Sequence, residues 1–191
     1  MIDLLGVALL VTDALDACGI RYTIGGSLAS SFSGEPRASI DVDIVVEMGP
    51  QQVQPFVAAL GQAFYADVDA VGRAVRHRST SNLIHQMSGA KVDLFVAGSP
   101  LDQRQLERRR RVQVAWQPDR FIHVHSPEDI LLQKLLWYRR GGEASERQWR
   151  DALSILVVQQ GRLDEAYLSL VAEEAGVSDL LDRARRQAAS R

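Results

Sequence analysis

Two short stretches decide the fold that this sequence predicts: Ser39-Ile40-Asp41-Val42-Asp43-Ile44-Val45-Val46 and, before it, Ile24-Gly25-Gly26-Ser27-Leu28. The first has the β-branched, apolar composition of a strand, interrupted by two aspartates. Because alternate side chains of a strand share a face, Asp41 and Asp43 project together from Cα atoms about 6.6 Å apart. Carboxylates held side by side repel each other unless a cation lies between them, and their oxygens suit a Mg²⁺ ion that carries a phosphate. We therefore expect this strand to bind a divalent cation.

The glycine pair, Gly25 and Gly26, follows a short expected strand and leads into a brief helix over 27–32. Glycines at such a turn allow backbone amides to approach a phosphate group closely. The pair therefore predicts a phosphate-binding turn close to the two aspartates.

A third carboxylate, Asp93, interrupts another apolar strand, which we expect over 91–96. Taken alone, it is explained equally well as a surface aspartate. Together with Asp41 and Asp43, it is interpreted as a group that completes a metal site or as the base that takes a proton from an attacking hydroxyl.

Composition indicates a globular protein of one or two domains, with 191 residues, 46% hydrophobic and 24% charged. The sequence predicts no signal peptide and no membrane span, so we expect a cytoplasmic protein without a membrane partner. Cys18 is the single cysteine, which excludes an internal disulfide and a cysteine-built zinc site. The net charge of −2 means that a nucleic-acid partner needs a local basic patch. Arg108 to Arg111 is such a patch, although basic residues at the end of the helix expected from about 102 to 111 are equally what its dipole favours.

The elements expected between these motifs follow from apolar periodicity. Residues 71–78 receive no assignment. The remaining assignments are a helix that starts at residue 4 and ends near Gly19, a helix over 51–65, and strands over 21–24, 40–47 and 82–86.

The last third of the chain predicts buried helices that each carry a charged residue. Ser126 and Pro127 start a helix that runs to Arg140 and is apolar nearly all round, yet contains Lys134. A second helix, over 145–160, places Asp151 on an apolar side. An ordinary interhelical ion pair, or a lysine that extends its ammonium to water, explains these residues without any function.

The order of Gly26-Ser27, Asp41-x-Asp43 and Asp93 resembles the nucleotidyltransferase superfamily with the DNA polymerase β-type fold, over about residues 1–125. The resemblance implies an α+β fold: a small mixed β-sheet flanked by helices (1–125), followed by a C-terminal helical region (126–191) that completes the active site. It implies that Gly25, Gly26 and Ser27 bind a nucleoside triphosphate such as ATP. It also implies that Asp41 and Asp43 hold Mg²⁺ or Mn²⁺ and that Asp93 lies near the acceptor hydroxyl and the metal.

The C-terminal third is similar to a narrower branch, the AbiEii-like or MenT-like nucleotidyltransferase toxins of toxin-antitoxin systems. In that branch a lysine on a Pro-Glu-Asp-Leu-type helix and an aspartate in a following Arg-Asp pair complete the active site; Lys134 and Asp151 occupy those places. This similarity implies that Lys134 neutralises and binds the triphosphate and that Asp151 steers the lysine or the acceptor. The sequence departs from the branch before the aspartate pair, where Arg37-Ala38-Ser39 stands in place of an arginine and threonine.

The function expected from these resemblances is metal-dependent transfer of a nucleoside monophosphate from an NTP to an acceptor hydroxyl. In a toxin, the acceptor would be tRNA and an antitoxin protein would restrain the activity. Two alternatives stay open: nucleotidylation of a small molecule, such as an aminoglycoside, or of a protein; and a nucleotide-binding or interaction module that has lost catalysis.

Overall fold

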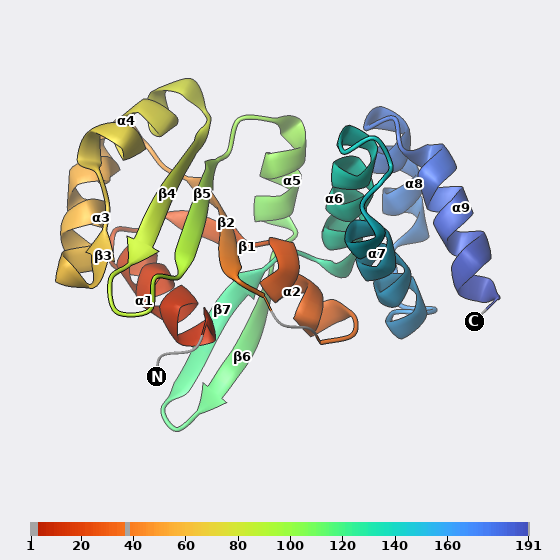
Figure 1. Cartoon of the computed structure of the whole chain (residues 1–191), viewed down its shortest axis with the longest axis horizontal. Coiled ribbons are helices and arrows are strands. Elements are labelled where there is room, and N and C mark those ends of the chain that lie inside the picture. The colour runs from red at the N-terminus through yellow and green to blue at the C-terminus, as the bar shows by residue number, and fades with distance from the viewer. Residues whose placement is uncertain (1–3, 37–38, 191) are drawn as a thin grey trace. The chain divides into compact units, whose positions relative to one another are not determined.

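The computed structural model describes residues 4–36 and 39–190 (Figure 1). The chain divides into two compact units. The first comprises Met1–Leu28 and Ala38–His125, and the second comprises Ala29–Arg37 and Ser126–Arg191. Helix α2 (Gly26–Ser33) begins in the first unit and ends in the second. The chain therefore enters the helical unit briefly before it returns to the sheet.

The described part of the first unit is built on a seven-stranded sheet in the order β3-β4-β5-β2-β1-β7-β6. The pairs β2/β5 and β1/β7 are parallel and the other neighbours are antiparallel. This mixed sheet with flanking helices confirms the predicted α+β class. The strands are β1 (Arg21–Ile24), β2 (Asp41–Glu47), β3 (Phe64–Tyr65), β4 (Thr80–His85), β5 (Lys91–Val96), β6 (Arg110–Trp116) and β7 (Asp119–Val124).

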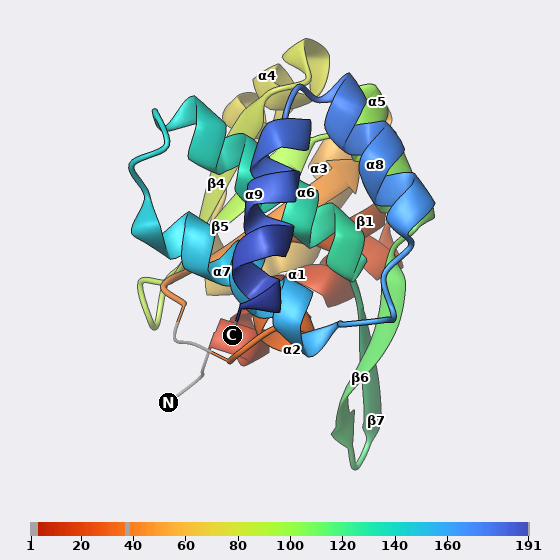
Figure 2. The same ribbon diagram turned by 90° about the vertical axis from the view of Figure 1, so that its right-hand side faces the viewer.

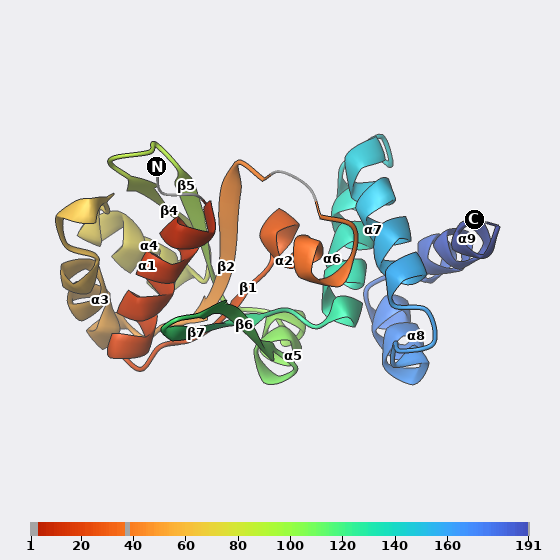
Figure 3. The same ribbon diagram turned by 90° about the horizontal axis from the view of Figure 1, so that it is seen from below.

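Helices cover both faces of this sheet (Figure 3). One face carries α1 (Leu4–Ala17), α3 (Val53–Leu60) and α4 (Val68–His77). The opposite face carries α5 (Pro100–Glu107), which begins at a capping box between Ser99 and Asp102.

The core of the first unit shows which side chains of β2 face which layer. Val45 packs with Ala97 and with Leu106 of α5. Since side chains alternate along a strand, Val42 and Ile44, both fully buried, face the layer of α1, α3 and α4. The odd-numbered residues of β2, including both aspartates, therefore share the face of α5.

The rest of the described part of the second unit consists of helices and their connecting turns, without a strand (Figure 2). Helix α6 packs against α7 and α8, and α9 packs against α7. Fully buried side chains such as Leu131, Leu135 and Leu168 form its core. The C-terminal helical region predicted from the sequence is confirmed: α6 (Pro127–Arg140), α7 (Glu146–Val158), α8 (Glu165–Glu174) and α9 (Ser178–Ala189).

Two expectations for the first unit need correction, and one segment without an assignment is helical. The helix expected over 51–65 is interrupted: a 3₁₀ turn (Pro50–Gln52) precedes α3, which ends at Gly61 in a positive-φ conformation, and Phe64 then begins β3. The unassigned residues 71–78 belong mainly to α4, which Asp67 caps through its side chain.

The second correction concerns the arginine run. The expected helix ends at Glu107, and Arg108 is its C-cap. Arg110 and Arg111 instead begin β6, because the alternating sequence that follows pairs with β7 in an antiparallel ladder. The favourable interaction of basic side chains with a helix C-terminus therefore accounts only for the first residues of the arginine run.

Within the described ranges, no helix is both long enough and apolar enough to cross a membrane.

Candidate functional site

Three aspartates lie on one face of the central strands β2 and β5, and we call them the three-aspartate cluster: Asp41, Asp43 and Asp93. The parallel register places Asp43 directly opposite Asp93. Residues opposite each other on neighbouring strands share a face, as do residues two apart on one strand. Asp93 is 8% exposed, and the other two are partly buried. The fold therefore gathers negative charge on one partly buried face of the sheet.

The glycine turn lies directly against this cluster. The amide of Gly25 donates to the carbonyl of Asp43 at 2.8 Å, which extends the β1/β2 ladder by one residue. Gly26 follows with φ +58°, and a Cβ at this position would lie 1.8 Å from Asp43 Oδ2. Only glycine fits here, because the backbone conformation and the close approach both exclude a side chain. Ser27 is buried in the first turn of α2.

Ser39 contacts the first aspartate of the pair. Its hydroxyl donates to the carbonyl oxygen of Asp41 at 3.0 Å and lies 3.5 Å from Asp41 Oδ1. This hydroxyl is suited to restrain the Asp41 side chain. Arg37 and Ala38, the other residues at which the sequence departs from the toxin branch, lie outside the described residues.

A cation that sequence reasoning gave no role, Lys91, reaches the cluster. Its Nζ lies 2.7 Å from Asp93 Oδ2, and Lys91 is the register partner of Asp41. The hydrogen bond to Asp93 raises the pKa of Lys91, and the nearby charges of Asp41 and Asp43 add to that increase. The sequence indicates that Lys91 and Asp93 lie close together, because Lys91 is two residues before Asp93 on one strand and so shares its face.

The cluster suits a divalent cation by residue type and by strand placement. Carboxylate oxygens are the ligands that Mg²⁺ and Mn²⁺ favour, and Gly26 leaves space beside Asp43 that any other residue would fill. Among the described residues, however, no three acidic, histidine or cysteine side chains converge closely enough to hold a metal ion. One reason is visible: Asp93 Oδ2 is directed to the Lys91 ammonium. The metal-binding roles of the three aspartates stay predictions.

The two charged residues singled out in the C-terminal region meet in the second unit. Lys134 Nζ on α6 lies 2.9 Å from Asp151 Oδ2 on α7, and the two side chains are 3% and 6% exposed. An ion pair this deeply buried carries a desolvation cost that makes it a weak source of stability, although loss of one partner is strongly destabilising. The sequence-predicted site residues thus form two groups: the aspartates and glycines in one unit, and this pair in the other.

The acidic residues at the start of α6 have structural partners. Asp129 accepts from Ser126 Oγ at 2.8 Å and from the hydroxyl of Tyr167 at 2.6 Å. Glu128 accepts from the backbone amide of Asp164, the N-cap of α8, at 3.0 Å. These contacts tie the beginning of α6 to the beginning of α8.

His125, at the end of β7, is fully buried on the α5 face of the sheet. Its Nδ1 lies 3.0 Å from Thr23 Oγ1, whereas Nε2 has no hydrogen-bond partner among the described residues. Burial lowers the pKa of His125 to about 3, despite the opposing charge of Asp102. The imidazole is therefore neutral at physiological pH and acts as part of the core.

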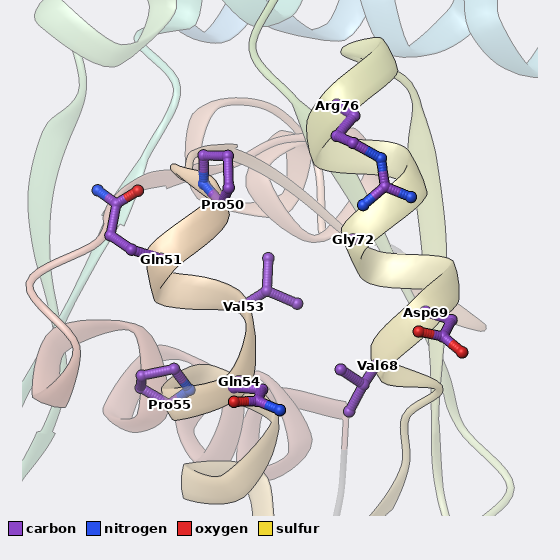
Figure 4. Close-up of a pocket in the computed structure, with 9 residues that line it drawn as sticks. All are labelled: Pro50, Gln51, Val53, Gln54, Pro55, Val68, Asp69, Gly72 and Arg76. Atoms are coloured by element: carbon purple, nitrogen blue, oxygen red, sulfur yellow. The ribbon is translucent and has the colours of Figure 1, made fainter.

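A groove of about 400 Å³ runs between α3 and α4 (Figure 4). Val53, Val68, Gly72 and Arg76 are among its lining residues. Since α3 and α4 cover the face opposite to α5, this groove is separate from the three-aspartate cluster.

No protein-family model and no curated protein matches this chain. Solved structures do. The antibiotic-resistance factor ANT(2″)-Ia, in its solution structure, is 16% identical, with 98% of this chain and 96% of that chain covered and a TM-score of 0.51. A crystal structure of ANT(2″)-Ia with adenylyl-2″-tobramycin is 12% identical over 94% of this chain and 97% of that chain, with a TM-score of 0.49.

An antigenic nucleotidyltransferase-like protein from Paracoccidioides brasiliensis is 19% identical over 94% of this chain and 91% of that chain, also with a TM-score of 0.49. At these identities the likeness concerns the fold. The chain has the nucleotidyltransferase fold predicted from its sequence.

Proposed function

We propose that this protein is a metal-dependent nucleotidyltransferase, which transfers a nucleoside monophosphate from an NTP to an acceptor hydroxyl and releases pyrophosphate. The observation that carries the proposal is the register of β2 and β5, which sets Asp43 opposite Asp93 with Asp41 on the same face. The glycine turn pressed against Asp43 supports it, because a phosphate can approach the backbone there. The nucleotidyltransferase fold supports it independently.

In this proposal Asp41, Asp43 and Asp93 would hold Mg²⁺ or Mn²⁺. The ion, when bound, supplies a positive charge that stabilises the triphosphate oxygens during displacement. The Gly26 amide and the Ser27 hydroxyl would bind phosphate oxygens, and Gly25, whose amide donates to the Asp43 carbonyl, would hold this nucleotide-binding turn against β2.

The proposed reaction is a displacement at the α-phosphorus of the NTP. The acceptor oxygen forms a bond to the α-phosphorus, the bond from that phosphorus to the pyrophosphate oxygen breaks, and the Asp93 carboxylate takes the hydroxyl proton. Lys134 neutralises charge on the triphosphate, and Asp151 holds the Lys134 ammonium in place. The burial of that ion pair supports a positioning role for Asp151.

The acceptor proposed first is tRNA, in a toxin that an antitoxin protein restrains. The exposed guanidinium groups of Arg110 and Arg111 on the edge strand β6 support an RNA acceptor, because phosphate contacts supply most of the non-specific affinity for nucleic acids. The Arg111 guanidinium lies over the Phe121 ring, 3.5 Å from its centroid, and is thereby oriented.

A small-molecule hydroxyl is the second candidate acceptor. It is favoured by the likeness to the antibiotic-resistance factor ANT(2″)-Ia, which extends over nearly the whole of both chains.

The test offers each labelled NTP, with Mg²⁺ or Mn²⁺, to total RNA, purified tRNA, an aminoglycoside mixture and the protein itself. We expect Asp43→Asn to lower label transfer more than about a hundredfold, because even outer-shell partners of a metal change activity by 10–100-fold. Glu47→Gln is the matched control, since Glu47 is on the same strand but pairs with Arg21 at 3.0 Å.

The labelled acceptor distinguishes the candidates. Label on tRNA, with growth arrest on expression that Asp43→Asn abolishes, supports the toxin. Label on an aminoglycoside supports the second candidate, and self-labelling supports protein nucleotidylation. If the protein binds nucleotide but transfers no label to any acceptor, the result supports the alternative of a nucleotide-binding module that has lost catalysis. Equal transfer by wild type and Asp43→Asn would refute the proposed metal site.

A further inference from the structure

Lys91 is placed so that its ammonium meets the three-aspartate cluster rather than solvent alone. It pairs with Asp93 on its own strand at 2.7 Å and lies in register with Asp41 on β2. Three carboxylates and one ammonium therefore share one face of two neighbouring strands. A cation located there reduces the repulsion among the carboxylates, as a divalent ion would.

The choice of lysine at this position has a physical consequence. Of the 22 lysine and arginine residues in the chain, only Lys91 and Lys134 are lysines, and each forms an ion pair with an aspartate. An arginine would bind a carboxylate with a rigid two-pronged donor set, whereas an ammonium is a compact charge on a flexible stem. The Lys91 side chain is 44% exposed, so its ammonium has room to leave Asp93.

We propose that Lys91 is a tethered counter-ion, which neutralises the three-aspartate cluster in the absence of a divalent cation and competes with that cation for Asp93. The inference rests on the proposed function, because it concerns loading of the same cluster. Binding of the divalent ion then requires displacement of the ammonium from Asp93 Oδ2. Lys91 thereby sets the concentration of divalent cation at which the site fills, and without that cation it offsets the repulsion among the three carboxylates.

The test measures Mn²⁺ binding without nucleotide, by the electron paramagnetic resonance signal of free Mn²⁺. We expect Lys91→Met to bind Mn²⁺ roughly tenfold more tightly than wild type, because the competing positive charge that lies 2.7 Å from Asp93 Oδ2 has been removed. Lys91→Arg keeps the charge and should bind no more tightly than wild type. Arg21→Met is the matched control, because the Arg21 side chain is also 44% exposed and is paired with a carboxylate, Glu47, that is not part of the three-aspartate cluster. The Mn²⁺ affinity of this variant should equal that of wild type.

Thermal unfolding gives a second readout that needs no activity. Without metal, Lys91→Met should unfold at a lower temperature than wild type, because the Asp93 carboxylate has lost the ammonium that lies 2.7 Å from it and the three-aspartate cluster has lost that positive charge. Saturating Mn²⁺ should raise its unfolding temperature by more than that of wild type. Equal thermal responses of the two proteins would count against a counter-ion role.

The binding results separate the two proposals. If Lys91→Met binds Mn²⁺ with wild-type affinity or more weakly, and Asp43→Asn abolishes binding in both backgrounds, Lys91 is not a competitor although the metal site stands. If Asp43→Asn leaves Mn²⁺ binding unchanged, or neither wild type nor Lys91→Met binds Mn²⁺, the metal site of the proposed function is refuted and the inference with it.

Discussion

The contact between Gly26 and Asp43 allows a sharp test, because the chain contains a matched glycine. Gly26 has φ +58°, and an added Cβ would lie 1.8 Å from Asp43 Oδ2 and 2.7 Å from Cγ. Gly19, in the same unit, has φ +62° and no heavy atom within 4 Å of the added Cβ. Alanine at either position therefore carries the same left-handed backbone strain, and only Gly26→Ala also displaces an aspartate.

The magnitudes follow from these two contributions. Left-handed strain costs about 1–2 kcal/mol for a residue with a Cβ, so Gly19→Ala should lower the free energy of unfolding by that amount. At Gly26 the Asp43 side chain must also move, and overpacking of this kind adds about 1–3 kcal/mol. We expect Gly26→Ala to lose about 2–5 kcal/mol in all.

Urea unfolding of both variants measures the stability difference, and Mn²⁺ binding measures the effect on Asp43. Gly26→Ala should weaken Mn²⁺ binding, whereas Gly19→Ala should bind as wild type does. If the two variants lose equal stability and bind Mn²⁺ equally well, the close approach of the glycine turn to Asp43 does not constrain the site.

Three further predictions concern buried polar groups. Lys134→Ala should destabilise the protein by about 3–5 kcal/mol, because it leaves Asp151 buried without its cation, and Lys134→Met combined with Asp151→Leu should recover most of this loss; a single variant as stable as wild type in urea would contradict the reasoning. Burial lowers the pKa of His125 to about 3 from its unfolded value of 6.5, so its contribution to stability is complete above pH 6.5 and is lost as the pH falls toward 3. Wild type should lose about 2 kcal/mol from this group between pH 6.5 and 5, at about 1.4 kcal/mol per pH unit, and His125→Gln should not; parallel pH profiles would show that the group contributes nothing. Tyr167→Phe removes one of the hydroxyl donors to the buried Asp129 carboxylate and should cost about 1–3 kcal/mol in chemical unfolding; an unchanged free energy of unfolding would contradict this role of the hydroxyl.

Local patterns in the sequence were sufficient for most elements near the site. The β-branched run around Asp41 and Asp43 predicted β2, and the Ser126-Pro127 start predicted α6. The incorrect element predictions arose where the local sequence pattern was weak or was compatible with two kinds of secondary structure. The arginine run suits a helix end as well as an edge strand, and only the pairing of β6 with β7 decides between them.

Within the candidate site, the strand period alone placed Asp41 and Asp43 on one face, and the glycine pair indicated a turn without a side chain. These are properties of neighbours in the chain, so the sequence by itself determined them. Tertiary structure decided the register that sets Asp93 opposite Asp43 rather than one residue away, which would have turned its side chain to the other face. It also decided that the ammonium of Lys91 meets Asp93 and that Lys134 meets Asp151, because such contacts depend on how strands and helices pack and not on the residues that precede or follow.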